Sequence, residues 1–255
     1  MFPILRLARI ACFFCLALLA RSAFSANRVT ILYDAFGANP TLTRDWGFSA
    51  LIGHDGKRIL FDTRNNPEIF EHNVRVLNMD LTKLDFAVIS HRHTDHASGL
   101  KYLLKINPDI NVYAPADGAN GFGGAEILPS FFRPEPSLCA KLRYFDGTYS
   151  EHVRSGKLCD TGHFVLVDKR TEVAPGIFLG YSVSKIPRAI ELPELTLAIK
   201  GPHGLILVDG CWHSGIEEIL QAASAVDSHT HIVFGGLHRP DTRAGHRSPR
   251  RFAQE

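Results

Sequence analysis

Four side chains that bind metal ions lie within six residues of this sequence. Residues 91–96 read HRHTDH, which supplies His91, His93, Asp95 and His96. Imidazole and carboxylate groups are ligands for zinc, iron and manganese in proteins. Because His91 and His93 are two apart, an extended segment points both rings the same way, and a following turn directs the other two to a neighbouring position. The spacing predicts one or two divalent metal ions at this point of the chain.

Metal ions held in this way support hydrolysis. Two ions about 3.5–4 Å apart hold a bridging hydroxide, which attacks a polar bond while the metals stabilise the developing negative charge. Surface histidines without a role are the alternative interpretation. The four ligands directly follow the apolar run Phe86–Ser90, and this favours the metal site because a strand end holds its side chains still.

The rest of the chain predicts the elements that position this motif. Phe86–Ser90 is apolar almost throughout, as in a strand buried on both faces. Asp55-Gly56 between two apolar runs predicts a hairpin, and Pro67 stands where a helix can begin. Strands first, then strand–helix units in each half, suit two mixed sheets with helices outside, an α/β (α+β) fold. We expect strands at 28–34, 46–52, 57–62, 86–90, 110–114, 163–167, 176–183, 195–199, 205–208 and 231–234, and helices at 68–77, 97–105 and 216–225.

The two ends of the chain differ from its middle. Two arginines precede the apolar run 10–20, and small residues follow at a cleavage position, so residues 1–25 are interpreted as the signal peptide of an exported, periplasmic or secreted protein. A retained anchor is the alternative, but the run is shorter than the roughly 20 residues of a membrane span, and we expect no stable membrane insertion after cleavage. The folded domain is expected at 26–242, with 115–160 as an insertion or lid and 243–255 as an irregular basic tail.

Charge and cysteine content narrow the partners. The first 25 residues hold three of the 28 basic residues and no acidic residue, which leaves 25 basic against 26 acidic residues. This balance does not favour a nucleic-acid partner, and we expect a small-molecule substrate. The sequence pattern leaves the oligomeric state open. In an oxidising compartment Cys139 and Cys159 could form a disulfide, which would leave Cys211 unpaired.

The motif and its flanks resemble a known family. HRHTDH matches the HxHxDH signature of the metallo-β-lactamase superfamily, with ILFDT upstream, FAVIS directly before it and ASGL directly after it. Within the superfamily the chain is most similar to the group of 7,8-dihydropterin-6-methyl-4-(ribofuranosyl)aminobenzene-5′-phosphate synthases, through TILYDAFGANP, WGFSALI, FVLVDKRTEVAPGIFLG, ELTLAIKGPHGLILVDGCWHSGI and FGGLH. These segments lie within residues 29–238. The resemblance implies a four-layer αββα sandwich.

The resemblance also implies roles for single residues. His91 and His93 would hold a first metal ion, and Asp95 and His96 a second, with zinc as the expected metal and iron or manganese as alternatives. Asp62 matches an acidic position that orients a ligating histidine, although it could also simply cap the strand end. Asp62 and Asp95 are the carboxylates expected to serve catalysis.

Further ligands are expected near the end of the domain. His213 falls between a strand and a helix, where a later ligand belongs, and the alternative is a polar residue at a helix start. His238 is a candidate ligand after a glycine pair. Asp209 either bridges the metals or serves as a turn residue. Cys211 is interpreted as a packed or weakly ligating thiol rather than a nucleophile.

Two departures from the family pattern concern the same site. Arg64-Asn65-Asn66 stands where the family has a glycine-led turn, so we expect the loop beside the site to differ. The chain also ends soon after His238, whereas family members continue through a helix and a strand with a further histidine motif. The sandwich is therefore expected to be incomplete at its C-terminus, with one sheet edge uncovered.

These observations support three functions. The leading hypothesis is a metal-dependent hydrolase that acts on a small substrate through a metal-bound hydroxide, since an exported chain is poorly placed for an intracellular pterin pathway. A transferase-like synthase, as the family name implies, is the alternative within enzymes. The third is a truncated, non-catalytic metal-binding homologue.

Overall fold

The computed structural model describes residues 27–34, 37–45, 47–116, 162–184 and 192–236. Several expectations fall outside these residues: the signal peptide, the pairing of Cys139 with Cys159, the ligand role of His238, the basic tail and nearly all of the insertion at 115–160. Among the described residues, no helix has the length and apolar character that crossing a membrane requires.

Six strands form the first sheet, in the order in which they follow along the chain. The first three strands pair antiparallel, and the pairs from β3 to β6 are parallel. Three α-helices and a 3₁₀ helix connect or flank these strands. The elements are β1 (Arg28–Tyr33), β2 (Ser49–His54), β3 (Lys57–Phe61), α2 (Pro67–Val76), η1 (Leu81–Lys83), β4 (Phe86–Val88), α3 (Thr94–Ala97), α4 (Leu100–Ile106), β5 (Asn111–Pro115) and β6 (His163–Val167).

Five strands form the second sheet, in the order β11-β10-β9-β8-β7. Neighbouring strands are antiparallel except β10 and β11, which pair in parallel and are connected along the chain by one helix. The elements are β7 (Thr171–Ala174), β8 (Ile177–Ser184), β9 (Leu192–Gly201), β10 (Gly204–Asp209), α5 (Ile216–Ser224) and β11 (Thr230–Gly235).

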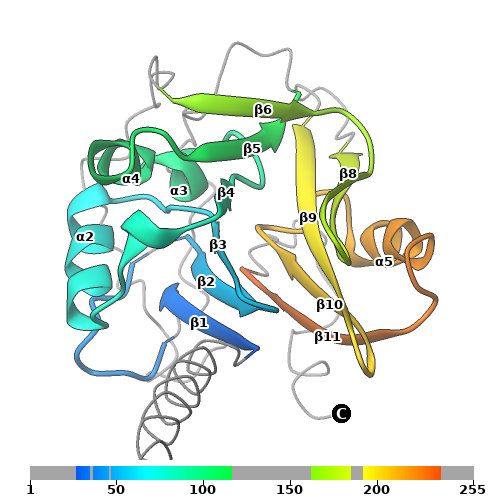
Figure 1. The fold of residues 1–255 in the computed structure, drawn as a ribbon, viewed down its shortest axis with the longest axis horizontal. Helices are drawn as coiled ribbons and strands as arrows, with labels where there is room; N and C mark the ends of the chain where they lie inside the picture. Colours follow the sequence, from blue (N-terminus) through cyan, green and yellow to red (C-terminus); the bar gives the residue numbers. More distant parts are fainter. Residues whose placement is uncertain (1–26, 35–36, 46, 117–161, 185–191, 237–255) are drawn as a thin grey trace, which may run out of the picture.

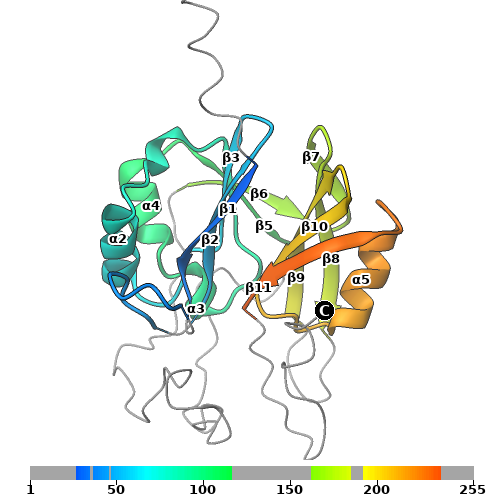
Figure 2. The ribbon, with the colours of Figure 1, turned by 90° about the horizontal axis from the view of Figure 1, so that it is seen from below.

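The two sheets face each other, and helices cover their outer sides. Figure 1 shows α2, α3 and α4 beside the first sheet and α5 beside the second, and Figure 2 shows the layers edge-on. Alternation along the strands explains the layers, because neighbouring side chains of a strand point to opposite faces. In β3, Ile59 and Phe61 point between the sheets while Leu60 packs towards the helices. The helix–sheet–sheet–helix order expected from the sequence is confirmed.

Local sequence explains how these elements begin and turn. Asp55 and Gly56 join β2 to β3 with φ angles of 46° and 79°, the left-handed pair that a tight hairpin needs. Pro67 opens α2, and the Asn66 side chain caps the helix by accepting hydrogen bonds from two backbone N–H groups at 3.0 and 3.1 Å.

A divided helix and an additional strand differ from the expectation. The helix expected at 97–105 is divided: α3 ends at Ala97 and α4 begins at Leu100. Gly99, the second of the two residues between them, sits where a Cβ would overlap the backbone oxygen of Thr63, so the break lets the chain pack against the loop that follows β3. Strand β7 was not expected, because its four residues alternate too briefly to stand out.

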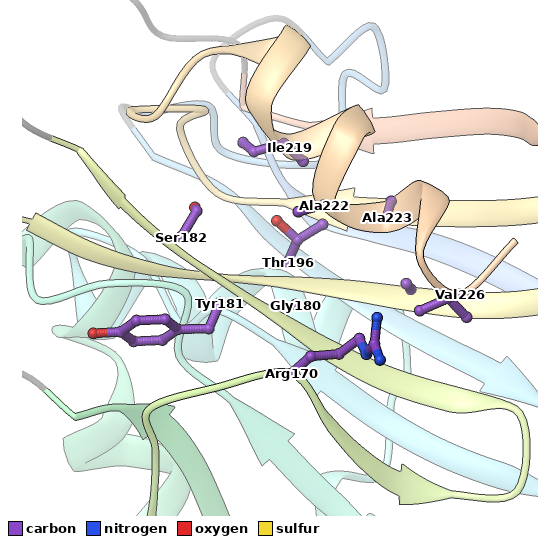
Figure 3. Close-up of a pocket in the computed structure, with 10 residues that line it drawn as sticks. Arg170, Gly180, Tyr181, Ser182, Thr196, Ile219, Ala222, Ala223 and Val226 are labelled. Carbon is purple, nitrogen blue, oxygen red and sulfur yellow. The ribbon is translucent and has the colours of Figure 1, made fainter. Parts of the chain in front are cut away.

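A small cavity lies on the outer face of the second sheet, beneath α5. Figure 3 shows its lining, which includes Gly180, Thr196 and Ile219, and its volume is about 20 Å³. Gly180 leaves this space because it brings no side chain to the middle of β8. One face of β9 packs between the sheets, and its opposite face lines the cavity.

Candidate metal centre

The two sheets meet at the ends of β4 and β10. Leu195 N, on β9, donates a hydrogen bond of 2.8 Å to Ser90 O, which follows β4. His91 comes directly after Ser90, and Cys211 comes two residues after the end of β10. The histidine motif of the first half and the Gly-Cys-Trp-His segment of the second half are thereby brought to one place.

Three imidazoles lie around one position. The ring centres are 4.6 Å apart for His91 and His93, 4.8 Å for His91 and His213, and 4.9 Å for His93 and His213. An imidazole bound at a zinc–nitrogen distance of about 2.0–2.1 Å has its centre about 3.2 Å from the ion, so two such rings on a tetrahedral ion have centres about 5 Å apart. The three rings therefore fit a single metal ion.

A second group of ligand atoms adjoins the first. His96 Nε2 lies 3.4 Å from Asp95 Oδ2 and 3.0 Å from Cys211 Sγ. Ligand atoms of His91, Cys211 and His213 lie within 4.8 Å of one another, as do those of His91, Asp95 and His96. An imidazole, a carboxylate and a thiolate form a set that suits zinc. The geometry gives Cys211 a place among the donors.

Asp62 and Ser90 orient the rings of His96 and His91 through contacts with their Nδ1 atoms. Asp62 Oδ2 is 2.6 Å from His96 Nδ1, and Ser90 Oγ is 2.8 Å from His91 Nδ1. Ser90 donates to both oxygens of Asp62, from its N–H and its hydroxyl, at 2.7 Å each. With Nδ1 of each ring engaged, Nε2 is left to face the metal position. Asp62 is fully buried with a φ of 56°, a left-handed conformation that an aspartate tolerates better than most residues.

Burial and neighbouring charges shift the pKa values in the centre. Burial, followed by the nearby His96 and His93, holds the pKa of His91 well below its usual value, so this imidazole is neutral. Burial also disfavours charge on His96, but Cys211, Asp95 and Asp62 outweigh it and raise the pKa of His96 well above the usual value. Burial raises the pKa of the Cys211 thiol to about 12. A coordinated metal would remove that proton, since metal-bound thiols are deprotonated.

Glu194 holds the turn that carries two of the donors. Its Oε1 accepts hydrogen bonds of 3.1 Å from the backbone N–H groups of Cys211 and Trp212, and its Oε2 accepts one of 2.8 Å from His213 N. The side chain is fully buried. The sequence analysis missed this residue, and its signal was a single acid within the apolar strand β9, whose first eight residues are all buried.

Asp209 has the contacts of a turn residue. Its Oδ1 accepts a 3.0 Å hydrogen bond from Trp212 N, and the Thr196 hydroxyl donates to its Oδ2. Burial, and then the neighbouring Glu194, raises its pKa well above the usual value. Trp212 has a φ of 62°, so the turn between β10 and α5 carries strained backbone, as functional sites often do.

The loop at Arg64-Asn65-Asn66, which was expected to differ from the family, has the left-handed backbone conformation that glycine favours, although it contains no glycine. Arg64 has a φ of 80° and is fully buried. Its N–H donates to His96 O at 3.1 Å, Thr63 N donates to the same oxygen at 2.7 Å, and Arg64 Nη2 reaches Asp45 O at 3.2 Å. The loop therefore holds the backbone of His96 from the side of the first sheet.

Comparisons with known proteins agree with this geometry. The family model of the metallo-beta-lactamase superfamily, whose members typically bind divalent metal ions, matches residues 42–220. A 7,8-dihydropterin-6-methyl-4-(beta-D-ribofuranosyl)-aminobenzene-5'-phosphate synthase of Methanocaldococcus jannaschii is 28% identical over 241 residues, which cover 83% of this chain and 77% of that protein. An uncharacterized protein of the same organism is 46% identical over 203 residues, which cover 75% of this chain and 72% of that protein.

A solved structure shows the same fold. The crystal structure of Tm1679, a metal-dependent hydrolase of the beta-lactamase superfamily, superposes with a TM-score of 0.61 and 22% sequence identity, covering 86% of this chain and 79% of that chain. The resemblance expected from HRHTDH and its flanks is confirmed. On the family match, the curated relatives and the fold, this chain belongs to the metallo-beta-lactamase superfamily.

Proposed function

We propose that this chain is a metal-dependent hydrolase of a small polar substrate. The observation that carries the proposal is the convergence of two ligand groups, His91, His93 and His213 beside Asp95, His96 and Cys211, at one junction of the sheets. Divalent ions in such a site lower the pKa of water towards neutrality and polarise carbonyl or phosphoryl oxygens. We propose zinc, because imidazole and thiolate donors together favour it over magnesium or calcium.

The residues of the chain divide the remaining work. His93 and His213 are partly exposed whereas His91 and His96 are fully buried, so substrate is expected to approach from the side of His93 and His213. Asp62 keeps Nε2 of His96 directed into the centre through its 2.6 Å contact with Nδ1. The carboxylate of Asp95, beside His96 Nε2, is the group placed to accept a proton from water during attack.

A synthase reaction is the alternative that one observation favours. The named relative with this chemistry aligns with 83% of this chain, and a site that polarises a phosphoryl or leaving-group oxygen serves group transfer as well as hydrolysis. We still favour hydrolysis, because the proposed export of the chain would separate it from an intracellular pterin pathway. A homologue that binds metal without turnover is the third candidate.

Metal content and turnover, measured together, test these proposals. The experiment measures zinc per chain and the hydrolysis of phosphodiester, lactone and β-lactam model substrates for the parent, His93→Ala, and the control His72→Ala, an exposed histidine on α2. We expect the parent to hold about two tightly bound zinc ions and to turn over one substrate class. Zinc binding and turnover should both be lost only in His93→Ala. Zinc without turnover above the level of His93→Ala would exclude hydrolysis of these classes. An arylamine ribose phosphate consumed only together with a pterin would establish the synthase.

A further inference from the structure

Three exposed histidines gather at the end of the second sheet away from the metal centre. His203 lies in the turn that joins β9 to β10, and His229 and His231 lie at the start of β11. The spacing of the three along the chain forms no ligand pattern in the sequence. The strand β10 spans six residues between this turn and Asp209, about 20 Å at 3.3 Å per residue, so the group is independent of the centre.

The backbone brings His231 towards His203. β10 and β11 pair in parallel, with Leu205 opposite Thr230 and Ile206 opposite Ile232. His231 therefore has no partner in the register and forms a bulge, a feature that re-aims a side chain. Leu205 N also donates a 2.8 Å hydrogen bond to His229 O, which fastens the start of β11 to the turn.

The spacing of the two rings matches that of two imidazoles on one ion. The ring centres of His203 and His231 are 5.5 Å apart, at an interplanar angle of 51°. Two imidazoles on a tetrahedral zinc ion have centres about 5 Å apart. The pairs within the candidate centre, at 4.6–4.9 Å, meet the same criterion.

We propose that His203 and His231 form a second, surface metal site that takes zinc, nickel or copper ions. Water completes the coordination, so binding is weaker than at the buried centre. The ring of His229 lies against Gly204, and the backbone N–H of His229 donates a hydrogen bond of 2.9 Å to Asp227 Oδ1, so this residue holds the turn in place. A bound ion ties the β9–β10 hairpin to β11, and it stabilises the fold because it binds the native state alone.

Zinc binding by the full chain tests the proposal. Equilibrium dialysis compares the parent with the double variant His203→Ala/His231→Ala and with the control His72→Ala/His163→Ala, which removes exposed histidines from α2 and β6. With zinc in excess, the surface site fills in addition to the two tightly bound ions of the centre, so we expect the first variant to bind one zinc ion fewer than the parent and the control to match the parent. The same number of ions in all three proteins would overturn the proposal.

Thermal unfolding gives a second readout that does not depend on the buried centre. The two proteins compared are the single variant His93→Ala, which weakens the centre, and the triple variant His93→Ala/His203→Ala/His231→Ala. Nickel ions are added to each. We expect nickel to raise the melting temperature when His203 and His231 are present, and to leave it unchanged when both are alanine. An equal rise in both would place the stabilising ion elsewhere and refute the site. Because the readout is stability, a failed hydrolase assay leaves this test intact.

Discussion

Replacing Glu194 with glutamine tests the view that one buried carboxylate holds the turn of the metal centre. The carboxylate accepts three backbone hydrogen bonds, from Cys211, Trp212 and His213. Glutamine has nearly the same shape but only one oxygen that accepts. Placed at the position of Oε1, this oxygen keeps two of the bonds, while the amide nitrogen faces His213 N and cannot accept from it.

The structure sets the size of the effect. A hydrogen bond to a charged group contributes about 1.5–3 kcal/mol, and a buried N–H left without an acceptor costs a similar amount. Burial raises the pKa of Glu194, so the neutral amide regains part of the cost of burying the charge. We expect Glu194→Gln to lower the free energy of unfolding by about 2 kcal/mol, which lowers the melting temperature by about 4–8 °C for a domain of this size.

Metal binding reports the positioning role separately from stability. Because Cys211 and His213 both lie in the turn, we expect Glu194→Gln to weaken metal binding by about 10–100-fold, as changes to residues that orient metal ligands do. In the cobalt-substituted protein, the thiolate-to-metal charge-transfer band from Cys211 should weaken or shift.

Glu172 offers a matched control. Its Oε1 accepts one hydrogen bond of 3.0 Å from Gly176 N at an exposed turn, so Glu172→Gln should change the melting temperature and the metal affinity little. The reasoning about Glu194 is refuted if Glu194→Gln binds metal as the parent does and its cobalt spectrum is unchanged. A fall in melting temperature with normal metal binding would leave Glu194 a structural residue only.

Three further predictions follow from other contacts. Asp62→Asn should weaken binding of the metal held by His96 by about 10–100-fold, measured by calorimetric titration, and unchanged affinity would show that the 2.6 Å contact does not orient the ring. Gly180→Ala should raise the free energy of unfolding by about 0.4–1 kcal/mol in denaturant titrations, since a Cβ there meets only Thr196 atoms at 3.6–3.7 Å and enters the cavity in Figure 3; a destabilised variant would contradict this. The Thr82 hydroxyl, with Lys83 and the Thr82 N–H, lowers the pKa of Asp80 from 3.8 to about 2, so its stabilising contribution is full above pH 3.8 and is lost as the pH falls towards 2. Asp80→Asn should flatten the pH dependence of unfolding in that window, and an unchanged slope would assign it to other carboxylates.

Local sequence patterns determined much of this protein. The HRHTDH stretch predicted four candidate donors, because ligands two and three residues apart at a strand end can converge without long-range information. The hairpin at Asp55-Gly56 and the capped start of α2 at Asn66 were equally readable, since a turn and a helix cap depend on the conformations of adjacent residues. The two mixed sheets with helices outside followed from the order of strands and helices along the chain.

Only the tertiary structure decided which distant residues complete the centre. Cys211 meets His96 across 115 positions, and Glu194 reaches the turn after β10 because β9 and β10 are neighbours in the second sheet. The pair of His203 and His231 depends on a bulge in β11. Periodicity shows which face of a strand is buried, but it does not show which strands become neighbours or in which register. Strand pairing within the second sheet sets the contacts of Glu194 and of His203 with His231, and the packing of the two sheets brings Cys211 to His96.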